Sequence, residues 1–138
     1  MVSLTIPGIP VPKGRPRLSK YGAYTPAKTV HYEKLVQQCY MDQADGVKLQ
    51  GALDIEIRFY FPIPKGYTKK QRQQIITGEL KYIKKPDLDN LIKCVTDALN
   101  KFAYDDDSQI IRLKANKYYA TDEIEPMAII DIWEVDNE

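Results

Sequence analysis

The clearest pattern along the chain is an alternation of apolar and polar residues that predicts strands. Over residues 52–61 apolar side chains fall at every second position, with charged or tyrosine side chains between them, which suits a strand with one buried face. Shorter alternations cover residues 2–6 and residues 111–119. Residues 127–133 are almost continuously apolar, so we expect a strand that is central or covered on both faces.

Two longer segments have the apolar spacing of helices. From Pro26 to Gln43, apolar side chains recur three and four residues apart and define one buried face. The same spacing runs from Asp87 to Asn100. Asp45-Gly46 suits the end of the first helix, and Asn100 suits a left-handed end of the second.

The remaining segments are short. Thr68 and Gln71 have the spacing of a capping box for a polar helix that ends at Gly78, and residues 80–85 favour a brief extended segment. The chain of 138 residues is long enough for one core and shows no repeat or linker. These elements predict a single α+β domain over residues 1–138, in which a mixed β-sheet of about four or five strands packs with two main helices.

The composition narrows the functional classes. Cys39 and Cys94 are far apart and lie on or beside apolar stripes, and His31 is the only histidine. Zinc binding and Cys-His catalysis are therefore poorly supported, and both cysteines are expected to be buried. Residues 1–12 carry three prolines and lack the basic start of a signal peptide, and no apolar run reaches membrane-spanning length. We expect a cytoplasmic protein.

The charge is divided between two parts of the chain. Residues 1–85 contain 15 basic and 6 acidic side chains, a balance of +9, whereas residues 86–138 contain 5 basic and 13 acidic side chains, a balance of −8. A basic part beside an acidic site suits a metal-dependent enzyme on a polyanion, because cations neutralise phosphates while carboxylates hold metal ions. Two solvated faces of opposite sign would have the same totals.

A basic segment rich in proline follows the first predicted strand. Residues 11–24 contain four cations and two tyrosines between prolines that exclude a regular helix. Arginine offers phosphate a bidentate fork and tyrosine offers bases a stacking face, which favours a nucleic-acid contact, although a stiff solvated loop has the same composition. With two lysines that precede the second long helix, the candidate nucleic-acid-binding residues are Lys13, Arg15, Arg17, Lys20, Lys84 and Lys85.

The acidic residues define a candidate metal site. Asp87 and Asp89 open the second long helix, Lys93 follows Asp89 by four residues, and residues 105–107 are three consecutive aspartates. We expect the turn after the helix to bring this triplet back to the helix start. Gathered carboxylates repel one another unless a cation neutralises them, and oxygen ligands with open coordination favour Mg²⁺. The spacing does not fit an EF-hand loop.

Each half of this pattern also has an ordinary explanation. An aspartate such as Asp87 often caps a helix, and an acid four residues before a lysine is a routine surface pair. The acidic triplet is the feature that distinguishes a metal site from a capped helix. Beside such a site, Lys93 would add positive charge where a phosphodiester becomes more negative during hydrolysis.

Together these residues resemble the RusA family of Holliday junction resolvases. The resemblance spans residues 6–112 and is carried by K-P-D-L-D-N-L-I-K at residues 85–93, D-A-L at residues 97–99 and D-D-S-Q-I at residues 106–110, with V-P-K-G-R-P-R upstream. It implies a homodimeric endonuclease that uses Mg²⁺, with Mn²⁺ as an alternative ion. Such an enzyme makes paired symmetric nicks in a four-way DNA junction during recombination and repair.

The resemblance also implies roles for individual residues. Lys101 stands where a glycine often follows the helix, and Asp105 is an extra acid, so the ligand within the triplet stays open. The implied catalytic residues are Asp87, Asp89, Lys93 and Asp107. The implied metal ligands are Asp87, Asp89, Asp107 and, in a supporting role, Asp106.

Two other functions remain open on the sequence alone. The chain could be a non-catalytic DNA-binding or packaging module, in which the acids serve as helix caps and salt bridges. It could also be a less selective nuclease for flaps or other branched nucleic acids. Cleavage of a panel of DNA substrates distinguishes these functions from junction resolution.

Overall fold

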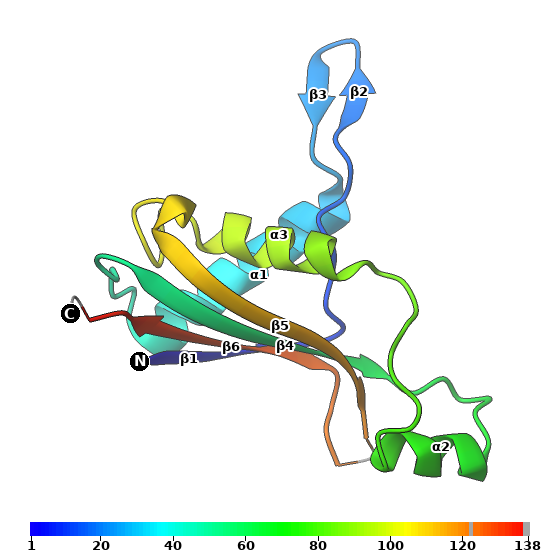
Figure 1. Cartoon of the computed structure of the whole chain (residues 1–138). Coiled ribbons are helices and arrows are strands. Elements are labelled where there is room, and N and C mark those ends of the chain that lie inside the picture. The colour runs from blue at the N-terminus through cyan, green and yellow to red at the C-terminus, as the bar shows by residue number, and fades with distance from the viewer. Residues whose placement is uncertain (122, 137–138) are drawn as a thin grey trace.

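A four-stranded mixed sheet organises the computed structural model, which describes residues 1–121 and 123–136. One edge pair of the sheet is parallel, and the other neighbouring strands run antiparallel. In order across the sheet, the strands are β1 (Val2–Pro7), β6 (Met127–Glu134), β4 (Leu53–Pro62) and β5 (Ile110–Ala120) (Figure 1).

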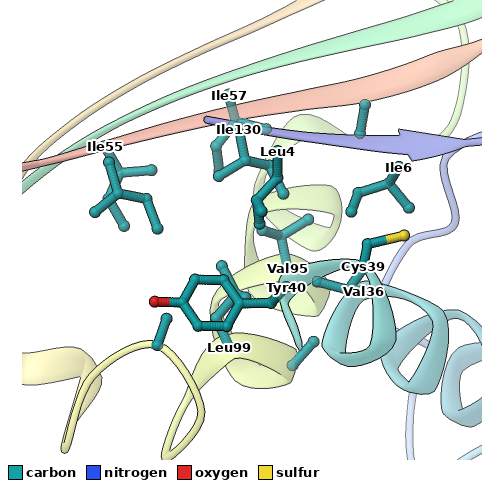
Figure 2. Packing of buried hydrophobic residues seen from close by; sticks show 14 of the residues in the cluster. Leu4, Ile6, Val36, Cys39, Tyr40, Ile55, Ile57, Val95, Leu99 and Ile130 are labelled. Carbon is teal, nitrogen blue, oxygen red and sulfur yellow. The ribbon is translucent and has the colours of Figure 1, made fainter. Parts of the chain in front are cut away.

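Two helices cover one side of this sheet. α1 (Ala27–Ala44) and α3 (Leu88–Leu99) lie on the same face and contact each other (Figure 1). Figure 2 shows isoleucine and leucine side chains of the strands meeting the side chains of these helices. Burying one such side chain fully contributes roughly 2 kcal/mol. The fully buried strand residues on this face include Leu4, Ile6, Leu53, Ile55, Ile57, Phe59, Ile130 and Ile132.

These elements confirm the predicted α+β fold and its single domain. The alternation over residues 52–61 becomes β4, with every second side chain buried. β6 is central, as expected, and its alternate residues Ala128, Ile130 and Ile132 are buried, while Ile129 lies half-buried on the face that α1 and α3 do not cover. Both cysteines are buried, which confirms that they are part of the core.

The basic segment after β1 is more regular than a loop. Strands β2 (Arg17–Ser19) and β3 (Gly22–Tyr24) pair antiparallel as a short hairpin. Gly22 closes the turn at a φ of 113°, which glycine adopts without steric penalty. The hairpin stands away from the sheet (Figure 1), so its side chains point into solvent.

The segment between β4 and α3 contains one short helix. α2 (Lys69–Ile76) begins with the predicted capping box of Thr68 and Gln71. Residues 80–85 form no strand, which corrects the expected extended segment. Lys117 Nζ donates to the carbonyl oxygen of Lys84 in this segment at 2.8 Å and to that of Pro86, just after it, at 2.9 Å.

The two long helices end differently. α1 ends at Asp45 in the left-handed conformation with a φ of 54°, as expected. The left-handed end predicted at Asn100 is wrong, because Asn100 is extended and Lys101 has the positive φ of 71°. Asn100 bridges to Tyr104, which keeps it extended and moves the turn one residue onward.

None of the helices among residues 1–121 and 123–136 combines the length and apolar character needed to cross a bilayer. The longest, α1, has 18 residues, and polar side chains such as Gln37 and Gln38 lie along it. Its one apolar stripe is used against β1 and α3.

Removing the hydroxyl of Tyr104 tests how the turn after α3 is held. This side chain is fully buried, and its hydroxyl donates to the carbonyl oxygen of Thr96 at 2.8 Å. We expect Tyr104→Phe to lower the free energy of unfolding by about 1 kcal/mol in urea denaturation. Tyr118→Phe is the control, since Tyr118 is exposed on β5. Equal losses in the two variants would contradict this role of the hydrogen bond.

Candidate active site

The first candidate carboxylates lie at the start of α3. Asp87 occupies the N-cap position, but its side chain caps no backbone N–H of the helix. Its Oδ1 instead accepts a hydrogen bond from Lys85 Nζ at 2.8 Å. This bond, with the charge of Lys85, lowers the pKa of the Asp87 carboxyl. Asp89 follows in the first turn and accepts the backbone N–H of Asn90 at 3.0 Å. Both carboxylates are exposed.

Lys93 does not contact the carboxylate four residues before it. Its Nζ lies 3.4 Å from Asp97, four residues onward. Asp97 also pairs with Lys13 at 3.2 Å, and Lys13 pairs with Glu33 at 3.2 Å. A chain of four alternating charges, which we call the Lys13 network (Glu33, Lys13, Asp97 and Lys93), therefore joins α1, the segment after β1 and α3.

Lys13 is the fixed centre of this network. Its backbone N–H donates to the carbonyl oxygen of Asn90 at 2.8 Å, and its side chain is only 19% exposed. Burial alone would lower the pKa of Lys13, but the carboxylates of Glu33 and Asp97 outweigh it and raise the pKa. The structure therefore places this candidate DNA-binding cation between two acids, whereas Arg15, Arg17 and Lys20 are exposed on or beside the hairpin.

The acidic triplet lies at the other end of α3. Asp106 Oδ2 accepts the backbone N–H of Ser108 at 3.2 Å and caps the short 3₁₀ turn Asp107–Gln109. The hydrogen bond from Ser108 lowers the pKa of the Asp106 carboxyl. Asp105 lies 3.6 Å from Lys48. Within the part of the chain that the structure describes, the Asp107 carboxylate makes no hydrogen bond or ion pair.

The two acidic groups do not meet within one chain, which corrects the expectation that the turn after α3 would join them. α3 has 12 residues and is therefore about 18 Å long at roughly 1.5 Å per residue. The turn after it brings the triplet to Lys101, at the carboxyl end of the helix, and then enters β5 (Figure 1). Over residues 1–121 and 123–136, no three acidic, cysteine or histidine side chains gather closely enough to hold a metal ion.

The chemistry of the donors nevertheless fits a hard cation. Carboxylate oxygens are the ligands that Mg²⁺ and Mn²⁺ prefer. Asp87 and Asp89 at one end of α3, and Asp107 at the other, have carboxylates that are not used to cap a helix. A site with three carboxylates would need groups from both ends.

Lys117 is a residue of this region that the sequence patterns did not single out. Its ammonium group lies 5.3 Å from the centre of the Tyr82 ring and donates to the carbonyls of Lys84 and Pro86. It thus fixes the backbone directly before Asp87. The available signal was a lysine at a position of β5 where the alternation requires an apolar side chain, since Lys117 is in register with buried Phe59.

The remaining candidate cations surround the same segment. Lys84 lies over the ring of Tyr67 at 5.0 Å from its centre, and its hydrogen bond lowers the pKa of the Tyr67 hydroxyl. Lys85 is exposed and pairs with Asp87. These two lysines therefore lie near the start of α3, whereas Arg17 and Lys20 lie on the β2–β3 hairpin, which stands away from the sheet.

Replacing Lys13 tests the Lys13 network. Lys13→Met leaves Glu33 and Asp97 without their shared, mostly buried cation, and we expect the free energy of unfolding to fall by about 2 kcal/mol. Lys48→Met removes the exposed pair with Asp105 and an exposed hydrogen bond to the carbonyl oxygen of Lys101, and should cost at most about 1 kcal/mol. Urea denaturation compares the two variants. A loss for Lys13→Met no larger than the loss for Lys48→Met would show that the network contributes no stability.

Comparison with known proteins shows the family to which the chain belongs. Residues 7–132 match the family described as Endodeoxyribonuclease RusA, which covers the three segments that carry the acids and the hairpin. The chain is also 34% identical over 140 residues to an uncharacterized protein, YqaN, of Bacillus subtilis (strain 168), and the alignment covers 97% of this chain and 96% of that protein. The chain belongs to the RusA family of endodeoxyribonucleases.

Proposed function

We propose that this protein is a Mg²⁺-dependent endonuclease that resolves four-way DNA junctions by paired symmetric nicks. The family match supports DNA cleavage. The observation that carries the rest is the position of Asp87 and Asp107 at opposite ends of α3, each free of a capping role. Mn²⁺, which takes the same oxygen ligands, should replace Mg²⁺.

The separation of the two acidic groups has a simple solution in a homodimer. If two copies related by a two-fold axis place their α3 helices antiparallel, the Asp87 end of one helix lies beside the Asp107 end of the other. Each dimer then has two equal sites, and each site takes carboxylates from both copies. Two equal sites suit the cleavage of two equivalent strands.

The other residues have roles that follow from their charge. Asp87, Asp89 and Asp107, assisted by Asp106, would hold the ion, which polarises a phosphodiester and orients the attacking water when bound. Lys93, exposed beside Asp97, would stabilise the negative charge that develops on the phosphate. Cations of the hairpin and of the segment before α3 would bind DNA phosphates, namely Arg15, Arg17, Lys20, Lys84 and Lys85. Lys13 would bind a DNA phosphate only if its ion pairs with Glu33 and Asp97 were broken.

The partners of the protein would therefore be branched DNA and a second copy of the chain. We place the protein in the cytoplasm, where its two buried free cysteines stay reduced. Cys94 is buried in α3, and burial raises the pKa of its thiol to about 12.

Incubation with a synthetic four-way junction tests the activity. With Mg²⁺ the wild-type protein should make symmetric nicks in opposite strands, and chelation of the ion should abolish them. Asp87→Asn should reduce the nicking rate by at least about a hundredfold, because a metal ligand is lost, while a mobility shift shows that the junction is still bound. Asp45→Asn is the matched control, since asparagine tolerates the left-handed backbone there.

Other substrates distinguish the remaining functions. A shifted junction that is never nicked would mean a binding module. Cleavage of flaps, hybrids or plain duplex as fast as of the junction would mean a less selective nuclease. Nicking by Asp87→Asn at the wild-type rate would show that the site is elsewhere.

Subunit mixing tests whether the sites are shared between copies. Asp87→Asn and Asp107→Asn are each expected to be inactive alone. In a mixed dimer, one site has both mutations and the other has neither, so nicks should return in one strand per junction. If each site belongs to a single chain, the mixture stays inactive. Asp105→Asn is the control within the triplet and should retain activity.

A further inference from the structure

A groove lies beside the segment that precedes Asp87. It runs between the end of α2, the residues that follow this helix and the last part of β5, and it has a volume of about 580 Å³. A space of this size accommodates a small organic ligand. The proposed phosphodiesterase chemistry does not use this groove.

Aromatic rings form much of its wall. Tyr60 and Tyr118 stack with ring centres 5.3 Å apart, and Tyr82 meets Tyr119 edge-on with ring centres 4.9 Å apart. Tyr118 is 40% exposed, so its ring is accessible from solvent. Ile76, on α2, is 67% exposed at the same groove. The groove therefore offers flat apolar surfaces to an incoming group.

Two lysines line the groove, and no acid is among the lining residues that the structure describes. Lys117 is held by the carbonyl oxygens of Lys84 and Pro86, so Lys81 is the cation that can meet a ligand. The ammonium group of Lys81 lies close to Gly78 at the groove. Stacking surfaces beside cations suit a ligand with a flat aromatic part and an anionic part, which is the chemistry of a nucleotide.

The position of the groove connects it to the proposed site. Lys117, which lines the groove, donates to the carbonyl oxygen of Pro86, one residue before Asp87. Lys117 and Tyr118 follow each other on β5, so the ring of Tyr118 lies on the sheet face that α3 does not cover. β5 is an edge strand of the sheet, so DNA that follows the lysines before α3 would reach the groove around this edge.

We propose that this groove binds one unstacked nucleotide next to the branch point of the DNA, with its base on Tyr118 and its phosphate near Lys81. This inference rests on the proposed function and deepens it. Bases within a continuous duplex are stacked on both sides, whereas a base at a branch leaves its stack at less cost. The groove would thus favour branched DNA over plain duplex without reading its sequence.

The test uses a four-way junction with 2-aminopurine beside the branch point, since the fluorescence of this base responds to stacking. All binding variants carry Asp87→Asn to prevent cleavage. Added Tyr118→Ala should abolish the fluorescence change on binding and weaken junction binding about tenfold, whereas Tyr118→Phe should keep both. Lys114→Ala is the control, because Lys114 is exposed on β5 outside the groove.

A second pair of variants avoids removing the tyrosine stack. Ile76→Glu places a negative charge in the groove and should weaken junction binding about tenfold, whereas the isosteric but neutral Ile76→Gln should bind at least three times more tightly than Ile76→Glu. Because Ile76 is exposed, neither change should unfold the protein. Equal binding by the two variants would contradict a phosphate in the groove.

The outcomes separate this inference from the proposed function. One outcome is that the wild-type protein nicks junctions while Tyr118→Ala leaves both the binding affinity and the fluorescence change of the Asp87→Asn protein unaltered. In that case the groove is not a nucleotide site and the nuclease assignment stands. If Tyr118→Ala turns dimers into monomers in light scattering, the groove is a subunit contact and the inference is wrong. A fluorescence change that depends on Tyr118, together with no nicking by the wild-type protein, would support the nucleotide site and overturn the nuclease assignment.

Discussion

The packing of α3 against the sheet is the constraint on which the candidate site depends. Leu91, Val95 and Leu99 are buried along one face of the helix and belong to the same core as the isoleucines of β4. This packing fixes both ends of α3 in space. The acids at its start and the acidic turn after its end therefore stay a helix length apart in every copy of the chain. The dimer proposed above would let them act together.

Charge has two different uses in this molecule. In the Lys13 network, Glu33, Lys13 and Asp97 are mostly buried and hold three segments together, while Lys93 is exposed at the end of the network. On the hairpin and before α3, cations are exposed, and each of them can meet a phosphate. Composition cannot distinguish these uses, because a lysine contributes one charge to the total in either place. Lys13 and Lys117 are both among the basic residues, yet each is committed to contacts within the fold.

Much of the fold could be predicted from local patterns, because a strand with one buried face and a helix with one buried face each impose their own period. β4 and α3 follow from such patterns. The position of Asp107 could not be predicted in this way, since it depends on which end of α3 the next turn reaches. Lys117 was missed for a related reason: its contacts are with carbonyls more than thirty positions away in sequence. The hairpin was missed because three-residue strands have too few positions to show a period.

The pairing of β1 with β6 also determines when the sheet can be completed during folding. Val2 of β1 lies opposite Ile132 of β6, and β6 in turn separates β1 from β4. During synthesis, β1 has no neighbour in the sheet until β6 has been made. Closing so long a loop is slow compared with forming a helix. A chain without β6 consequently lacks the completed sheet beneath α3, so that a DNA-cutting activity would arise only after β6 has been added.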